Sequence, residues 1–143
     1  PVKSVYASTA QRALKYKTGD VVSASLNHES GLSTQITAIL KTPHYQRITI
    51  WGENGWVELV DSSHPDTPGP SFMKIVMNDG SVKEENFDWT DTVSANIENF
   101  SDAINKEDEY LFKDIEKFQN IAVLEAIYQS SITKKSIDVE SFN

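Results

Sequence analysis

Side chains that could bind a polar ligand lie in two short segments of the first half of the chain. Arg12 lies in "AQRALKYK", and His44 lies in "KTPHYQR" beside Tyr45 and Arg47. Guanidinium and imidazole groups donate hydrogen bonds, which an anionic or polyol ligand can accept. Arg12 and His44 are therefore the predicted substrate-contact residues. The alternative is that both lie on polar strand surfaces, with Arg12 facing water.

Another cluster of polar side chains lies in "DSSHPD", which contains Asp61, His64 and Asp66. Carboxylate oxygens and imidazole nitrogens are metal ligands. The segment begins a loop rich in proline and glycine (62–71), however, and polar side chains in such loops more often cap turns. The chain has no cysteine, which excludes disulfides and thiolate metal sites. We therefore predict no metal site, and we interpret His28 as a turn residue.

Patterns typical of catalytic machinery are absent from the sequence. There is no G-x-S-x-G nucleophile motif, no G-x-G-x-x-G turn and no Walker loop. We predict no catalytic and no cofactor-binding residue in this chain, and a small enzyme that uses His44 and Arg12 remains an alternative. Three tryptophans could stack on sugars, although large aromatic residues more often complete a core or an interface: Trp51, Trp56 and Trp89.

The composition fits one ordinary globular domain of 143 residues, with 24% charged residues and a net charge of −8. Nucleic acids and anionic membranes attract basic surfaces, so this acidic chain is not predicted to bind either. No apolar run approaches the roughly 20 residues that cross a bilayer. Because there is no cysteine and no signal peptide opens the sequence, we predict a cytoplasmic location.

The first half of the chain alternates with the period of a β-strand. In the segment 20–27, Val22, Ala24 and Leu26 share one face, opposite Ser23. β-branched residues are frequent, and turn residues separate the apolar runs. The pattern predicts a meander with strands at 20–27, 34–41, 46–51, 56–60, 72–77 and 81–87.

After residue 90 the period becomes that of an α-helix. One apolar stripe runs through 91–105, and Asp91 or Thr92 is the predicted cap of this helix. A second helix is predicted over 114–135, with Asp114 as its cap. This second helix is apolar nearly all round, so it needs partners on more than one side.

Strands followed by helices indicate the α+β class. We predict a single domain over residues 1–143, built as a large, mostly antiparallel open sheet with both helices packed on one face and a short last strand at 136–139. The other face carries Thr, Ser, Gln, Arg, Val, Ile and Trp, a mixture too apolar for a fully solvated surface. We predict that this face is an oligomer interface, and the alternative is an ordinary solvent-facing sheet.

Several segments occur in an order known from one protein family. They are "SVYA" (4–7), "TGDVVSASLNHESG" (18–31), the hairpin "RITIWGENGWVELVD" (47–61), and the helical segments "ANIENFSDAINKEDEYLF" (95–112) and "DIEKFQNIAVLEAIYQSS" (114–131). Together they resemble the C-terminal domain of the Gfo/Idh/MocA oxidoreductases. In the hairpin, Gly55 is the predicted left-handed residue of a bulged turn.

The resemblance implies that full-length relatives are NAD(P)-dependent dehydrogenases or reductases, mostly of sugars and polyols. It also implies an N-terminal Rossmann domain that binds the dinucleotide, a catalytic Glu-Lys-Pro motif, and a C-terminal sheet that forms the floor of the substrate pocket and an oligomer interface. "IEKF" (115–118) lacks the proline and lies in a predicted helix, so this chain does not match the catalytic motif.

We therefore expect a truncated C-terminal substrate and oligomerisation domain that is inactive by itself. NAD or NADP is expected in the full-length parent protein and no cofactor in this fragment. The expected partners are further copies of the chain and the missing Rossmann domain. The alternative is a free-standing ligand-binding or assembly module with no redox activity.

Overall fold

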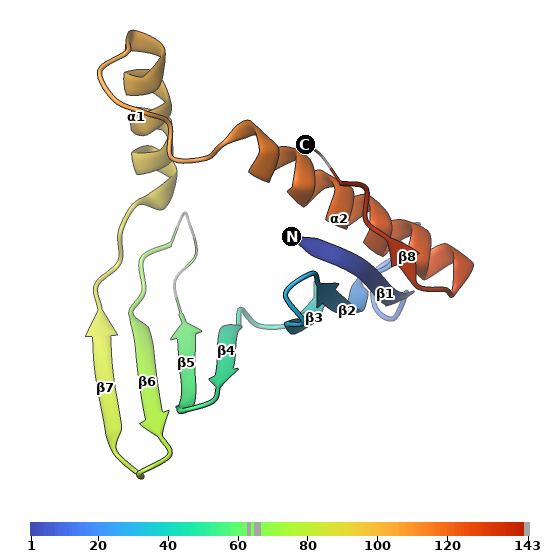
Figure 1. Ribbon diagram of the computed structural model, residues 1–143, viewed down its shortest axis with the longest axis horizontal. Helices are drawn as coiled ribbons and strands as arrows, with labels where there is room; N and C mark the ends of the chain where they lie inside the picture. The colour runs from blue at the N-terminus through green and yellow to red at the C-terminus, as the bar shows by residue number, and fades with distance from the viewer. Residues whose placement is uncertain (63, 65–66, 142–143) are drawn as a thin grey trace. The chain divides into compact units, whose positions relative to one another are not determined.

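The structure, a computed structural model, describes residues 1–62, 64 and 67–141 (Figure 1). The chain divides into two compact units. Unit 1 comprises residues 1–42 and the segment from residue 111 onward, and unit 2 comprises residues 43–110. The described strands form two antiparallel sheets of four strands each, which confirms the α+β class. The sequence predicted one sheet, and the hydrogen bonds divide the strands into two.

Unit 1 contains a sheet with the strand order β3-β2-β1-β8, and one helix packs on it. Its elements are β1 (Val2–Ala10), β2 (Val21–His28), β3 (Ser33–Ile39), α2 (Asp114–Thr133) and β8 (Ile137–Asp138). β8 follows α2 along the chain and pairs with β1 at Ser4 and Val5. The short last strand predicted from the sequence is therefore present.

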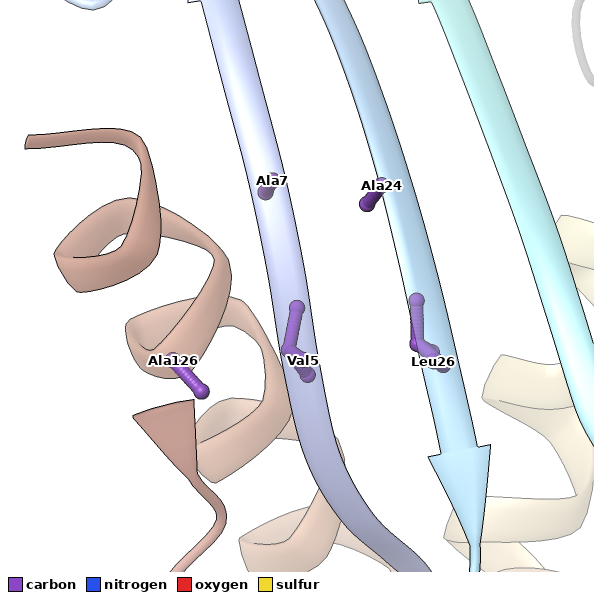
Figure 2. Packing of buried hydrophobic residues seen from close by; sticks show 5 residues of the cluster. All are labelled: Val5, Ala7, Ala24, Leu26 and Ala126. Carbon is purple, nitrogen blue, oxygen red and sulfur yellow. The ribbon is translucent and has the colours of Figure 1, made fainter. Parts of the chain in front are cut away.

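The register of β1 and β2 places their apolar residues on one face of this sheet. Val5 lies opposite Leu26, and Ala7 lies opposite Ala24. All four are at most 5% exposed, and Ala126 of α2 packs against them (Figure 2). Because alanines occupy three of these five positions, the helix can approach the strands closely.

Unit 2 contains a four-stranded meander in which every strand pairs with the next along the chain. Its elements are β4 (Gln46–Gly52), β5 (Gly55–Asp61), β6 (Ser71–Met77), β7 (Val82–Phe87) and α1 (Thr92–Asn105). The predicted strands of this segment are all present, and each of their ends differs from the prediction by no more than one residue. The predicted helix is present as well.

The register of unit 2 separates two faces of its sheet. The face that we call the mixed face carries Arg47, Thr49, Trp51, Trp56, Glu58, Val60, Phe72, Lys74 and Val76. The other face is apolar over most of β4–β6, where it carries Ile48, Ile50, Val57, Leu59, Met73, Ile75 and Met77, while β7 adds Lys83 and Glu85 to it. Charge pairs cross the mixed face from strand to strand, since Arg47 contacts Glu58 at 3.6 Å and Lys74 contacts Glu84 at 2.9 Å. The alternation therefore agrees with the period that the sequence shows.

Helix α1 begins where the sequence predicted. Asp91 is its N-cap, and the Asp91 carboxylate accepts hydrogen bonds from the Ser94 N–H at 2.9 Å and from the Ser94 hydroxyl at 2.8 Å. The structure describes every residue of α1, and none of them is buried. Its apolar stripe is exposed along its length, at Val93, Ile97, Phe100 and Ile104. The stripe is exposed although the Phe100 ring meets the Tyr110 ring edge to face, with the centroids 5.4 Å apart.

Helix α2 begins at Asp114, the first residue of the predicted range, but its N-cap is Lys113 and not Asp114. The Lys113 N–H donates to Glu116 Oε2 at 2.9 Å, so the carboxylate of a residue in the first turn accepts the hydrogen bond of the N-cap amide. One side of α2 is buried at Ala126, Ser130 and Ser131, while Ile121, Leu124, Tyr128 and Ile132 are exposed. The exposed side agrees with the prediction that this helix needs a further partner. Of the helices described, none is both long and apolar enough to cross a bilayer.

The turn between β4 and β5 differs from the prediction. Gly52 pairs with Gly55 and the register of the hairpin is continuous, so the turn consists of Glu53 and Asn54 and contains no bulge. Gly55 has a φ of +154°, which is not the left-handed helical conformation that we expected. A Cβ atom at Gly55 would lie 2.2 Å from the Val76 carbonyl oxygen, so the close approach of β6 requires glycine here.

Candidate functional site

The loop between β1 and β2 is closed by one carboxylate, and we call residues 11–20 the Asp20 loop. Asp20 Oδ1 accepts a hydrogen bond from the Arg12 N–H at 2.6 Å. Asp20 Oδ2 accepts from the N–H groups of Ala13 at 2.6 Å and Leu14 at 2.7 Å. The Asp20 side chain is buried, so these three amides replace the water that would otherwise solvate its charge. The carboxylate therefore fixes the backbone at the start of the loop.

The same hydrogen bonds determine the charge state of Asp20. The Arg12 N–H lowers the pKa of Asp20 from its ordinary value of 3.8, burial opposes that effect, and the N–H groups of Ala13 and Leu14 lower the pKa further. A carboxyl group with a lowered pKa is ionised at neutral pH and is a weak base. The geometry and the pKa both indicate a structural carboxylate.

We expect Asp20→Asn to loosen this loop. The asparagine side chain would place its NH₂ group, a hydrogen-bond donor, against backbone N–H groups that are also donors. The folded-state pKa is below the unfolded value, so the stability that the carboxylate contributes is complete above about pH 3.8 and is lost as the pH falls through the folded-state pKa. The difference in melting temperature between wild type and variant should be largest at neutral pH and should shrink below pH 3.8. Thermal unfolding followed by circular dichroism from pH 2 to 7 measures it. A difference that does not change with pH would contradict this role.

The two predicted substrate-contact residues lie in different units, so each is described separately. Arg12 lies in the Asp20 loop and not on a strand, because β1 ends at Ala10, and its side chain is exposed. His44 lies just before β4, and its ring meets the ring of His64 edge to face with the centroids 5.8 Å apart. Their role in substrate binding stays a prediction.

The predicted absence of a metal site remains a prediction as well. Among the described residues, no group of three or more His, Asp or Glu side chains is arranged to hold a metal ion. Of the loop cluster, Asp61 accepts a hydrogen bond from the Ser71 hydroxyl at 3.0 Å, whereas Asp66 lies outside the described residues. His28 ends β2, and its Nε2 lies 2.9 Å from the Thr34 hydroxyl oxygen.

A groove of about 510 Å³ lies between α2 and β8 in unit 1. Its lining is mainly apolar, and three carboxylate side chains also border it. The lining residues are Phe118, Ile121, Ala122, Glu125, Ala126, Gln129, Ile137, Asp138 and Glu140. With an apolar lining and acidic borders, the groove suits an apolar surface better than an anionic small molecule.

The residues of this chain do not fit a dinucleotide at either helix N-terminus. A dinucleotide pyrophosphate needs free backbone N–H groups at the start of a helix and no competing negative charge. The Asp91 carboxylate occupies the Ser94 N–H at the start of α1. The first turn of α2 carries Asp114 and Glu116. Both termini therefore present carboxylates where a pyrophosphate would have to bind.

A scan against protein families gives one match that covers nearly the whole chain. Residues 1–139 match the Gfo/Idh/MocA model described as "Oxidoreductase family, C-terminal alpha/beta domain". The chain belongs to this family. Membership in the Gfo/Idh/MocA C-terminal domain family confirms the resemblance on which the sequence analysis relied, and it agrees with the α+β architecture. A comparison with curated protein sequences gives no significant match.

Solved structures share the fold. The WlbA dehydrogenase from Bordetella pertussis, in complex with NADH and UDP-GlcNAcA, has a TM-score of 0.72 and 24% identity over 99% of this chain. An oxidoreductase from Agrobacterium radiobacter, in complex with NAD+, L-tartaric acid and magnesium, has a TM-score of 0.73 and 19% identity over 96% of this chain. The match covers 41% and 43% of those proteins. The chain thus spans about two-fifths of the length of these oxidoreductases.

The closure of the Asp20 loop was not predicted from the sequence. The sequence of segment 18–31 shows the alternation of a strand and a place in the family order, and neither feature indicates that Asp20 closes the preceding loop. An aspartate that caps its own turn bonds a residue about two positions away, whereas Asp20 reaches back six to eight residues. A hydrogen bond across that separation leaves no local pattern in the sequence.

Proposed function

We propose that this chain is the C-terminal domain of a two-domain NAD(P)-dependent oxidoreductase that acts on sugar- or polyol-like substrates. In this proposal the domain supplies part of the substrate pocket and an oligomer interface, and it catalyses nothing by itself. The observation that carries the proposal is the family match over residues 1–139. The proposed compartment is the cytoplasm.

The comparisons support the cofactor part of this proposal. Both neighbours named above were crystallised with a nicotinamide dinucleotide, and each is more than twice as long as the segment that resembles this chain. In this chain, carboxylates occupy both helix N-termini. The dinucleotide is therefore assigned to the remainder of the parent protein, which in this proposal is a Rossmann domain.

The substrate part of the proposal concerns the side chains that this domain offers. Arg12 and His44 are exposed groups that donate hydrogen bonds to hydroxyl or carboxylate oxygens. The ligands named for the two neighbours, UDP-GlcNAcA and L-tartaric acid, carry such oxygens. This domain binds and orients the substrate, and the reacting groups lie in the rest of the parent protein.

The oligomer interface is proposed on the sheet face with polar and apolar residues, which in unit 2 is the mixed face. Trp51 lies there and is 72% exposed, directly opposite Trp56 on the neighbouring strand. Phe72 and Val82 add exposed apolar surface to the same face. An exposed tryptophan on a face that also carries ion pairs is typical of an interface between subunits, where aromatic residues are enriched.

The test uses the complete protein encoded by the reading frame that contains this chain. We expect it to reduce NAD+ or NADP+ with a sugar, a polyol or a sugar acid, and we expect the 143-residue chain alone to bind neither dinucleotide. In light scattering, Trp51→Ser should lower the oligomeric mass, while Tyr45→Ser, which changes a side chain of similar exposure, should not. Micromolar binding of NADH by the isolated chain would contradict the proposal. A complete protein without dinucleotide dependence would favour the free-standing module.

A further inference from the structure

Four basic residues lie on two segments that meet at one end of the sheet in unit 1. Arg12, Lys15 and Lys17 lie in the Asp20 loop, and Lys41 follows β3. The Leu40 N–H donates to the Asp20 carbonyl oxygen at 2.9 Å, which ties the end of β3 to the start of β2. All four side chains are exposed. We call these four residues the basic cluster.

Within the described part of the chain, the four residues of the basic cluster form no ion pair. The described residues form ion pairs through other cations, namely Arg47, Lys74, Lys83 and Lys117. The acidic residue within the Asp20 loop is Asp20, and its carboxylate is buried on three backbone amides. In a chain of net charge −8, the cluster is therefore a local positive surface.

The Asp20 loop also limits how a ligand can bind. The amides of residues 12–14 already donate to Asp20, so a ligand at this part of the loop must be held by the basic side chains and not by a backbone cradle. Gly19, with a φ of +88°, lies so close to β1 that a Cβ atom would be 2.7 Å from the Ala10 carbonyl oxygen. The two ends of the loop are thus anchored while its middle carries the lysines.

We propose that the basic cluster binds a phosphoryl group of a small-molecule ligand. An Arg guanidinium binds two phosphate oxygens at once, and lysines add point charges around them. Up to four positive charges match a diphosphate better than a single carboxylate. The proposal shares Arg12 with the proposed substrate site, but the two can fail separately, because pyrophosphate binding needs no dinucleotide and no catalytic step.

Calorimetric titration with pyrophosphate tests the site on the 143-residue chain. Replacing two charges of the cluster, in Lys15→Gln/Lys17→Gln, should raise the Kd for pyrophosphate by about tenfold or more. The matched control Lys3→Gln/Lys135→Gln removes two charges of the same unit outside the loop, and it should change the Kd less than about twofold. An equal effect of both double variants, or no binding by wild type, would overturn the proposal.

Two further measurements keep the outcome clear. Amide chemical shifts in NMR spectra should move on addition of pyrophosphate at residues 11–20 and 40–42, and the spectrum of the double variant shows whether it is folded. Citrate carries a similar charge on carboxylates, and it should bind at least about tenfold more weakly. If citrate bound as tightly as pyrophosphate, the cluster would bind anions by charge alone. That result would overturn the phosphoryl assignment.

Discussion

Gly55→Ala should destabilise unit 2 by about 3 kcal/mol or more, the largest effect that we expect from any single substitution. The added Cβ atom would lie 2.2 Å from the Val76 carbonyl oxygen and 2.9 Å from the Met77 Cα atom, and both belong to the backbone of β6. Backbone cannot rotate away as a flexible side chain can, so β5 and β6 would have to separate. The φ of +154° adds further strain for any residue with a Cβ atom.

Urea denaturation followed by tryptophan fluorescence measures this effect. All three tryptophans of the chain lie in unit 2, so the signal reports on that unit. The matched control is Gly52→Ala at the other end of the same turn, where a Cβ atom would meet the Gly55 carbonyl oxygen at an ordinary 3.7 Å. The control should cost less than about 1 kcal/mol. Equal losses for the two variants would show that the approach of β6 is not what requires glycine.

The second large effect is expected at Ser130, which is completely buried between α2 and β1. Its hydroxyl oxygen accepts a hydrogen bond from the Ala7 N–H at 2.8 Å, and the hydroxyl donates to the Lys135 carbonyl oxygen at 2.6 Å. β8 pairs with β1 at Ser4 and Val5, so the Ala7 N–H lies beyond the end of that pairing. The Ser130 hydroxyl oxygen therefore accepts the hydrogen bond of a β1 amide, that of Ala7, which lies beyond the pairing with β8.

Ser130→Ala should cost about 2 kcal/mol, because it leaves the Ala7 N–H buried without a hydrogen bond. Far-ultraviolet circular dichroism during urea denaturation measures the loss through α2, the longer of the two helices. Thr133→Ala is the matched control, since Thr133 is exposed and donates to the Gln129 carbonyl oxygen within its own helix. The control should stay within about 0.5 kcal/mol of wild type. A loss no larger for Ser130→Ala than for the control would contradict this account.

The elements of this fold could be predicted from the sequence because their periods are clear. The alternation around Val22, Ala24 and Leu26 predicted which residues of β2 share a face, and two of these became core residues. Asp91 could be recognised as a helix cap, because a cap acts on residues two or three positions away. Each of these signals is local, so a single sequence contains it.

The division into two sheets depends on interactions that are not local. β3 ends at Ile39 and β4 begins at Gln46, and the connection contains Pro43, which lacks a backbone donor. Turn residues in this connection mark the break in the sequence, but the period of two does not indicate which strands pair across it. The role of Gly55 was missed for the same reason, since the contact that requires it comes from β6.

The assignment of functional residues was limited by the same lack of distant information. Arg12 and His44 were selected by residue type alone, and the structure places Arg12 on a loop whose shape depends on Asp20. Ser130 was not selected at all, because a serine in a helix gives no sign that it reaches another strand.

The closure of the Asp20 loop has an evolutionary consequence. Asp20 binds main-chain N–H groups of residues 12–14, so these hydrogen bonds do not depend on which side chains these residues carry. Positions 12 and 13 are exposed, so they tolerate most residues, with proline as the exception because it lacks the N–H. Point mutations can therefore change the exposed side chains of this loop while the aspartate preserves the same backbone path.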